Sequence, residues 1–310
     1  MKKPVKSTEL LAALAFVLAT FISIAVAFFS ASKANAFERI NANTVRIKIL
    51  SYNVKGLPAL INPDWDQNRF GDIGSILGAH RDAGLAPDIV LLQEAFSNRT
   101  PELAQNSRYP FNVVGPSSSK IINSGLSILS EFPIEFHQTL LYGDLDCGTW
   151  DCFASKGAEI VRLQLPGVPF LLTIANTHVQ SDRDQEAARG AQLHDFAVFL
   201  ASLVNRDLGL LAGGDFNTTP SQKTYQDFVR ATNMKDSGEL CLTANSGCSL
   251  LGTTTRKTAV DRSLDHIFVA NGHKVTMKPI SVERTFTKPY KGRMLSDHAG
   301  YEAVFEITYN

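Results

Sequence analysis

Four short segments of this chain combine a run of apolar residues with Asp, Glu, Asn or His, and this pattern constrains the fold most. In residues 210–217 (LLAGGDFN), the apolar run stops at two glycines and is followed by Asp215 and Asn217. Short apolar runs bounded by glycine are typical of buried strands. Residues two apart in a strand point to the same side, so a carboxylate and an amide are expected side by side at this strand end.

Three other segments show the same combination. They are residues 89–94 (IVLLQE), residues 171–178 (LLTIANTH) and residues 264–269 (LDHIFV), the last followed by residues 295–298 (LSDH). Any one of them is equally well explained by polar turn residues. Sites of α/β proteins, however, form on the loops next to strand ends, so the four segments together predict one shared polar site.

The chain beyond residue 36 is predicted to form a single domain, because no linker, repeat or low-complexity run interrupts residues 37–310. A chain of 310 residues is long enough to bury a sizeable core. Residues 59–71 are expected to form a loop. Further strands are expected at residues 44–53, 125–130, 157–165 and 170–176, and helices at residues 73–83 and 183–205.

The first 36 residues form a separate segment. Lys2, Lys3 and Lys6 precede an apolar stretch over residues 10–30, and residues 34–36 (ANA) offer a cleavage site with small side chains. This arrangement predicts an export signal that is removed after residue 36, and therefore a periplasmic or secreted protein. The alternative is an uncleaved membrane anchor formed by residues 10–30, because the apolar stretch approaches the length of a spanning helix.

The charge balance of the chain is close to neutral. The complete chain has 30 basic and 30 acidic residues. Removal of residues 1–36 takes away four lysines and one glutamate, which leaves 26 basic and 29 acidic residues and a net charge of −3. A strongly basic face for nucleic acid is not evident from these totals, although a local patch is compatible with them.

The four cysteines form two close pairs in the sequence, Cys147 with Cys152 and Cys241 with Cys248. In an oxidising compartment an even count suggests two disulfides, and each local pairing would close a small loop, although three connectivities remain open. A metal cluster is the weaker interpretation, because no His lies at zinc-finger spacing from these cysteines.

Five motifs in a fixed order resemble the signature of the endonuclease/exonuclease/phosphatase superfamily, which has the deoxyribonuclease-I-like fold. The motifs are QE at 93–94, NTH at 176–178, GDFN at 214–217, LD at 264–265 and SDH at 296–298. Asn53 and residues 125–130 fit the same pattern. The resemblance covers residues 45–305. It implies an α/β four-layer sandwich, two mixed β-sheets packed face to face with helices on the outer sides, and a catalytic domain that cleaves phosphate esters.

The resemblance also implies roles for individual residues. Water that attacks a phosphodiester needs a base, an acid at the leaving oxygen and positive charge near the other oxygens. His298 suits the base because its ordinary pKa is near neutral, and the family pairs such a His with the carboxylate at Asp265. Asp215 and Asn217 are expected to orient the water and the phosphate. His178 is expected to donate a hydrogen bond to the phosphoryl oxygen or to protonate the leaving group.

A metal site is expected beside these residues. Glu94, with Asn53 beside it and Asp297 as a further candidate, is expected to bind Mg²⁺, a hard ion that prefers one or two carboxylates plus waters. Mn²⁺ or Co²⁺ are expected substitutes. Asn98 lies four residues after Glu94, the offset at which bacterial sphingomyelinases place a ligand of a second, peripheral metal site.

Residues 151–157 (DCFASKG) are similar to the sphingomyelinase branch of the superfamily, in which such an Asp and Lys form a switch over the active site. Lys156 would then bring a cation to the substrate phosphate beside Asp151. The alternative is an ion pair on the surface. Secreted members also carry an aromatic hairpin that enters the bilayer. Residues 282–294 contain only Phe286 and Tyr290 and no Trp, which departs from that pattern.

The sequence therefore predicts a secreted, Mg²⁺-dependent phosphodiesterase, a monomeric phospholipase C of the sphingomyelinase type that acts on a phospholipid at a membrane surface. The first alternative is a secreted endonuclease that binds nucleic acid through basic side chains along its cleft. The second is a binding protein on the same fold without catalysis. Basic candidates for the nuclease are Arg69, Arg183, Arg189, Arg256, Lys257 and Arg262.

Overall fold

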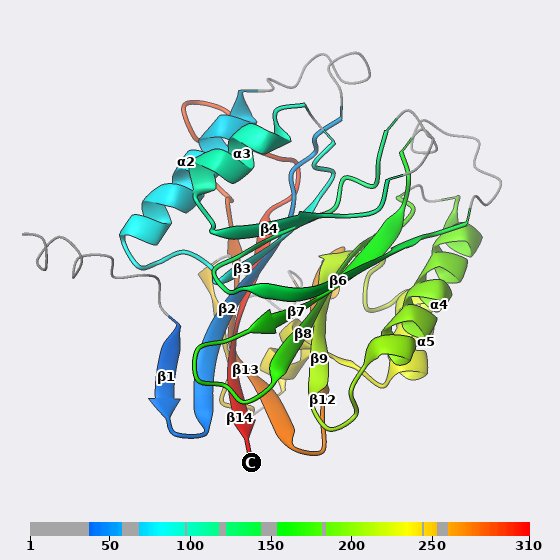
Figure 1. The fold of residues 1–310 in the computed structure, drawn as a ribbon. Helices are drawn as coiled ribbons and strands as arrows, with labels where there is room; N and C mark the ends of the chain where they lie inside the picture. Colours follow the sequence, from blue (N-terminus) through cyan, green and yellow to red (C-terminus); the bar gives the residue numbers. More distant parts are fainter. Residues whose placement is uncertain are drawn as a thin grey trace, which may run out of the picture.

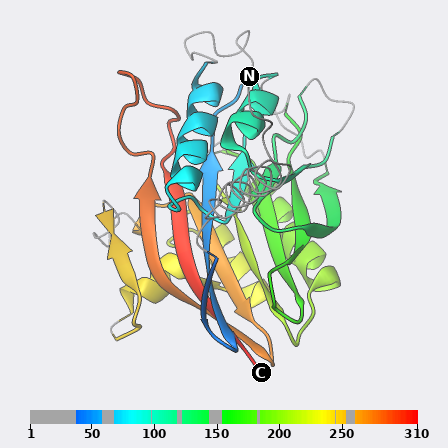
Figure 2. The same cartoon turned by 60° about the vertical axis from the view of Figure 1, so that its left-hand side comes forward.

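The computed structural model describes residues 37–57, 68–96, 98–117, 122–143, 154–181, 184–243, 245–252 and 260–310 (Figure 1). Two mixed β-sheets pack face to face and helices cover their outer sides (Figures 1 and 2). This is the α/β sandwich that the motifs predict, so the expected fold class is confirmed. The predicted leader at residues 1–36 lies outside the described residues.

The first sheet has eight strands in the order β11-β13-β14-β2-β3-β5-β4, with β1 paired to β2. The central strands β2 and β3 run parallel, and Asn53 at the end of β2 is the register partner of Gln93 at the end of β3. The strands are β1 (Glu38–Asn41), β2 (Thr44–Asn53), β3 (Ile89–Gln93), β4 (Phe111–Val114), β5 (Ser127–Ser130), β11 (Ser249–Leu251), β13 (Val275–Thr285) and β14 (Gly300–Tyr309).

The second sheet has six strands in the order β10-β12-β9-β8-β7-β6. Its central pair, β8 and β9, is also parallel, which brings His178 into register with Asp215. Asp265 at the start of antiparallel β12 is the other register partner of Asp215. The strands are β6 (Ile134–Leu141), β7 (Gly157–Gln164), β8 (Leu171–His178), β9 (Gly209–Asp215), β10 (Lys235–Asp236) and β12 (Asp265–Asn271).

In the part of the chain that the structure describes, two long helices lie on each sheet. The helices α2 (Arg69–Asp82) and α3 (Thr100–Ser107) lie on the first sheet, and α4 (Glu186–Leu203) and α5 (Lys223–Thr232) lie on the second (Figure 1). A short helix, α6 (Ser237–Leu242), follows β10. The expected loop over residues 59–71 is wrong for residues 69–71, because α2 begins at Arg69; residues 58–67 lie outside the described residues.

Arg69 explains why α2 begins where it does. The side chain is fully buried, and its guanidinium group donates hydrogen bonds to the carbonyl oxygens of Val54, Lys55 and Leu295. A buried cation needs such partners, since an unpaired one is costly. The first turn of α2 is thereby tied to the segment after β2 and to the segment that precedes His298.

One of the two expected disulfides lies in the described residues, where Cys241 is bonded to Cys248. Cys147 and Cys152 lie outside them. None of the helices in the described ranges combines the length and the apolar character that crossing a membrane requires.

Asp88, just before β3, should make the stability of the fold depend on pH. Its side chain is buried, and one carboxylate oxygen accepts a hydrogen bond of 2.7 Å from the amide of Lys48. Burial raises the pKa of Asp88 to about 7 despite this hydrogen bond, and the charge of Glu131 adds to the effect. Between the ordinary pKa near 4 and this value, the folded chain holds a proton that the unfolded chain has lost.

Stability at this site therefore falls as pH rises from about 4 to about 7, by at most about 1.4 kcal/mol per pH unit. Asp88→Asn removes the titrating group, so we expect the free energy of unfolding of the variant to fall less steeply between about pH 4 and about pH 7. Urea unfolding of the unaltered chain and of Asp88→Asn at about pH 4.5 and 7.5 measures this difference. An equal pH dependence in the two proteins would contradict the assignment.

Candidate active site

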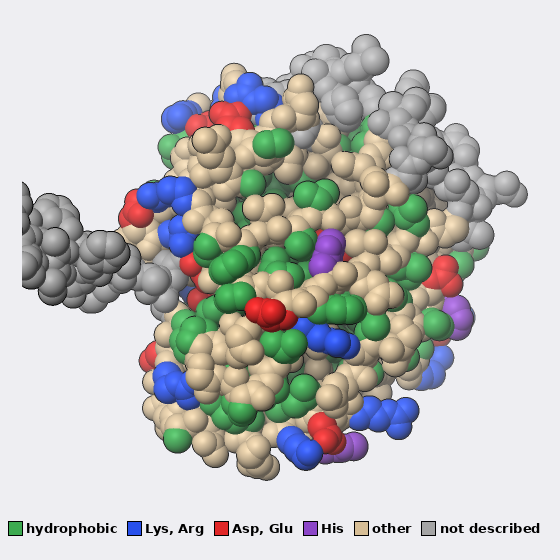
Figure 3. Space-filling model, in the orientation of Figure 1, with side chains coloured by type: hydrophobic (Ala, Val, Ile, Leu, Met, Phe, Trp, Pro, Cys, Tyr) green, Lys and Arg blue, Asp and Glu red, His purple; other side chains and the backbone are tan. Residues whose placement is uncertain are grey.

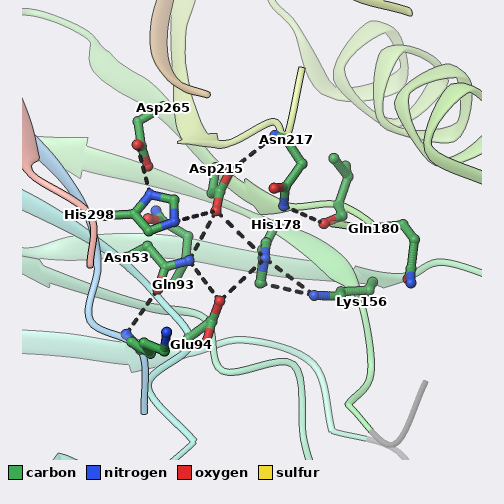
Figure 4. Close-up of polar contacts among 12 residues, drawn as sticks. Asn53, Gln93, Glu94, Lys156, His178, Gln180, Asp215, Asn217, Asp265 and His298 are labelled. Carbon is green, nitrogen blue, oxygen red and sulfur yellow. Dashed lines mark hydrogen bonds and ion pairs between the residues drawn. The ribbon is translucent and has the colours of Figure 1, made fainter. Parts of the chain in front are cut away.

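Six polar side chains from the two sheets meet at one end of the sandwich (Figure 4). The first sheet provides Asn53 at the end of β2, Glu94 directly after β3 and His298 two residues before the start of β14. The second sheet provides the other three side chains from neighbouring strands, namely His178, Asp215 and Asp265. The site is thus built half by each sheet.

Asp215 is at the centre of the cluster. Its carboxylate is buried, and Asn53 Nδ2 donates to Asp215 Oδ2 at 2.9 Å and to Glu94 Oε1 at 2.8 Å. The same Asp215 oxygen lies 3.8 Å from the Nε2 atoms of both His178 and His298. Burial, followed by the charge of Asp265, raises the pKa of Asp215.

His298 is oriented by Asp265. The distance from His298 Nδ1 to Asp265 Oδ2 is 2.9 Å, which leaves Nε2 facing Asp215. Burial by itself lowers the pKa of His298. The charge of Asp265 and its hydrogen bond, followed by the charge of Asp215, outweigh burial and raise the pKa to about 10. The imidazole is therefore held in one orientation by a carboxylate partner.

Lys156 brings a cation into the cluster. The residue is only 5% exposed, and its Nζ lies 3.2 Å from Nε2 and 3.5 Å from Nδ1 of His178 (Figure 4). His178 Nε2 is in turn 4.0 Å from Glu94 Oε1. A buried ammonium beside an imidazole is suited to receive an anion. Asp151, its expected partner in a switch, lies outside the described residues.

Among the described residues, two groups of side chains have the geometry to hold a metal ion. One is Glu94, His178 and Asp215, and the other is Asp215, Asp265 and His298; within each group the ligand atoms lie within 4.8 Å of one another. Oxygen donors dominate both groups, as hard divalent cations require. Asp265 Oδ1 is buried and has no hydrogen-bond partner among the described residues, so a donor or cation is missing there. The residues fit a divalent cation.

The loop geometry that presents Glu94 depends on Gly125. Glu94 itself adopts a left-handed conformation with φ of 53°, which is uncommon for a residue with a side chain. Gly125 also has a positive φ of 64°, and a Cβ atom there would lie 3.0 Å from Glu94 Cα and 2.4 Å from the Phe96 ring. Only glycine therefore allows the segment before β5 to approach Glu94 so closely.

The sequence profile of the Endonuclease/Exonuclease/phosphatase family matches residues 50–298 of this chain. The chain belongs to this family.

Two curated relatives of this family member are named sphingomyelinases. It is 27% identical over 304 residues to Sphingomyelinase C 2 of Leptospira interrogans, a match that covers 86% of this chain and 47% of the relative. It is 29% identical over 241 residues to the Putative neutral sphingomyelinase of Drosophila melanogaster, covering 71% of this chain and 53% of the relative. The chain thus spans about half the length of these relatives.

Solved structures share the fold of this family member. The structure of SmcL is 25% identical with a TM-score of 0.60, covering 85% of this chain and 99% of that one. Sphingomyelinase C from Streptomyces griseocarneus is 21% identical with a TM-score of 0.64, covering 84% and 99%.

Three of the residues predicted for the site lie at its margin or away from it. Asp297 is half-exposed, with 45% of its side chain accessible, and forms an ion pair with Lys55. It belongs to neither group of potential metal ligands. Asn98 is exposed and lines a groove beside α3. Asn217 donates from Nδ2 to the carbonyl of Val179 at 3.0 Å, while its backbone amide donates to Asp215 at 3.0 Å.

A buried polar row beneath the site was not foreseen from the sequence. Gln93 Nε2 donates to Asn176 Oδ1 at 2.8 Å, which links the two sheets, and Asn176 Nδ2 donates to Glu159 Oε1 at 3.1 Å. Glu159 Oε2 is 3.1 Å from Nε2 of His137 on the edge strand β6. Burial raises the pKa of Glu159. A signal was available, because Glu159 interrupts the apolar strand β7 on the face that points between the sheets.

Because the site is divided between the sheets, this row should fix their relative position. Asn176→Ala removes partners from Gln93 and Glu159 in the core, so we expect a loss of about 2–5 kcal/mol in the free energy of unfolding. Asn112→Ala, on exposed edge strand β4, is the matched control and should change it by less than about 0.5 kcal/mol. Urea unfolding of both variants gives the comparison. Equal free energies of unfolding for the two variants would show that the buried polar row does not stabilise the packing of the sheets.

Of the basic residues predicted for a nuclease cleft, Arg69, Arg189 and Arg262 lie in the described part of the chain, and Arg262 is exposed. Arg69 and Arg189 are buried, and Arg189 donates to the carbonyl of Gln180 at 2.9 Å. Arg183, Arg256 and Lys257 lie outside the described residues. On the face shown in Figure 3, Lys and Arg side chains are scattered and interspersed with Asp and Glu. The expectation of Arg69 and Arg189 as surface contacts is therefore wrong, because both satisfy backbone carbonyls inside the protein.

The two aromatic residues between β13 and β14 pack inward. The Phe286 ring stacks on Tyr52 with a centroid distance of 4.6 Å and an interplanar angle of 17°. Phe286 and Tyr290 both pack, partly buried, against the apolar cluster beneath α2. The segment therefore packs these two rings against the core, with both rings only partly buried.

Proposed function

We propose that this chain is a Mg²⁺-dependent phosphodiesterase of the sphingomyelinase type, which hydrolyses a phospholipid to a lipid alcohol and a phosphorylated head group. The observation that carries the proposal is the buried Lys156 ammonium beside His178, within a cluster of carboxylates at the end of both sheets. An endonuclease has no evident need for this cation. The names of the curated relatives point in the same direction.

In the proposed reaction, water attacks phosphorus and the bond from phosphorus to the lipid oxygen breaks. His298 takes the proton of the water at Nε2, because Nδ1 is held by Asp265. Asp215 and Asn217 orient the water and the phosphate. Lys156 offsets negative charge on the non-bridging oxygens, and His178 donates a proton to the leaving oxygen.

Glu94 and Asp215, whose carboxylates share the Asn53 amide, would hold the divalent ion. When bound, Mg²⁺ supplies positive charge to the phosphate oxygens and the leaving group. The raised pKa of His298 stems from the surrounding carboxylates. Offsetting their charge lowers that pKa toward the neutral range in which a base is effective.

We further propose that residues 1–36 direct export, that residues 37–310 form one catalytic domain, and that the protein acts as a monomer at a membrane surface. Asp151 is assigned to the switch with Lys156, Asp297 to the rim of the metal site and Asn98 to a second, peripheral metal. Export is tested by locating the protein in cell fractions and by determining the N-terminal residue of the mature chain.

The substrate assignment is tested with the purified chain and two substrates. We expect release of phosphocholine from sphingomyelin vesicles in the presence of Mg²⁺, and loss of release when the metal is chelated. Plasmid DNA is the second substrate. Nicking of DNA that falls steeply with salt, without hydrolysis of any phospholipid, would establish the endonuclease instead.

A further inference from the structure

A cavity of about 490 Å³ lies on the outer side of the first sheet, between α2 and residues 285–295. Figures 1 and 2 both show this segment beside α2. None of the residues assigned to catalysis lines the cavity. Its apolar wall includes Leu50, Leu77, Leu85, Phe286, Tyr290 and Leu295. The volume falls within the range of small-molecule sites, and the wall is suited to an alkyl chain.

Two carboxylates also line this cavity. Glu283 on β13 and Glu302 on β14 are register partners, so their side chains lie directly opposite each other. Like charges in this arrangement repel. Burial raises the pKa of Glu302. The charge of Lys48 lowers this pKa, and the charge of Glu283 raises it further.

Within the described ranges, the cationic groups near this pair compensate its charge only in part. Lys48 Nζ is 3.7 Å from Glu302 Oε1 and also donates to the carbonyl of Leu85 at 3.0 Å. Glu283 has no ion pair among the described residues. Lys288 lines the cavity but is exposed. His80 also lines it, and burial, followed by the charge of Lys48, lowers the pKa of His80, which favours the neutral ring. A positively charged group would therefore relieve the repulsion between the two glutamates.

We propose that this cavity binds an amphiphilic cation, with its alkyl chain against the apolar wall and its ammonium group against Glu283 and Glu302. An anionic amphiphile of the same length would meet the same wall but the wrong charge. A short ammonium ion would meet the charge but leave the wall uncovered. The site is separate from the catalytic cluster and does not depend on the proposed hydrolase activity.

Calorimetric titration of the full chain with octyltrimethylammonium, kept below its micellar concentration, tests the proposal. We expect saturable binding at one site, and binding at least about tenfold weaker for octyl sulfate and for tetramethylammonium. Glu302→Gln should weaken binding of the octyl cation by about tenfold or more, because a charge-assisted contact is lost. Glu306→Gln is the matched control, since Glu306 lies on the same strand but pairs with Arg46.

Ile76→Phe provides an independent variant, because it fills the cavity from α2 and leaves both glutamates in place. It should weaken the octyl cation at least about tenfold and carries the test if Glu302→Gln does not fold, which thermal unfolding reveals. Equal binding of octyl sulfate, or unchanged binding in both variants, would overturn the proposal. The experiment measures binding and not turnover. Absence of binding would therefore leave the hydrolase proposal unaffected, and absence of hydrolase activity would leave the proposed binding site unaffected.

Discussion

Replacement of His298 by alanine is expected to lower turnover of the proposed phospholipid substrate by roughly 10²–10⁴-fold, the usual contribution of a general base. His298 Nδ1 is 2.9 Å from Asp265 Oδ2, so the ring is fixed and only Nε2 is left to accept a proton. Alanine removes that acceptor and leaves the strands that hold the other groups intact. Steady-state release of phosphocholine from vesicles measures the effect.

His273→Ala is the matched control, because His273 is exposed and pairs with Asp207 at the opposite end of β12. It should retain full turnover. A second variant, Asp265→Asn, keeps the shape of the partner but removes its charge, and should also lower turnover. Should His298→Ala hydrolyse sphingomyelin at the rate of the unaltered chain, the base has been assigned to the wrong residue.

Replacement of Glu94 by alanine is expected to raise the Mg²⁺ concentration needed for half-maximal activity by at least about tenfold. Glu94 Oε1 and Asp215 Oδ2 accept hydrogen bonds from the same Asn53 amide at 2.8 and 2.9 Å, so they form a pair of oxygen donors. Removing one of the two carboxylates should weaken the affinity for a hard ion more than it affects proton transfer to His298. A metal titration of the hydrolysis rate gives the shift.

Glu135→Gln, on the exposed edge strand β6, serves as the control and should leave the metal requirement unchanged. Saturating Mg²⁺ should restore a large part of the activity of Glu94→Ala, which separates a ligand from a group needed for folding. Full activity of Glu94→Ala at low Mg²⁺ would show that the ion is held elsewhere.

Local physics made the strands that carry the site predictable. Polar residues at the ends of apolar runs placed His178, Glu94 and Asp215 at strand ends, as the structure has them. The expected alternation of Asp215 with Asn217 is wrong, because β9 ends at Asp215 and Asn217 adopts a left-handed conformation with φ of 47°. The β13 and β14 strands were not anticipated, although burial alternates along the first half of β13 and most of β14, which is a strand signal. The helix α5 was also missed, since its buried positions are few.

The burial of individual polar residues was not predictable to the same degree. Arginine side chains are usually exposed, but those of Arg69 and Arg189 are buried. Both donate hydrogen bonds to backbone carbonyl oxygens of other segments. Asp297 follows a buried serine, and its side chain forms an ion pair with Lys55, a partner that the sequence does not specify. These choices depend on partners far away in the sequence, which alternation within one strand does not specify.

By itself, then, the sequence determined which residues stand at strand ends and which neighbours share a face, because side-chain direction within a strand is a local property. Only the tertiary structure decided that Asp215 contacts Asn53 and lies between His178 and His298. It also decided that Asn176 joins Gln93 to Glu159 between the sheets. Pairing of strands and packing of sheets are non-local, so these contacts exist only once both sheets have closed on each other.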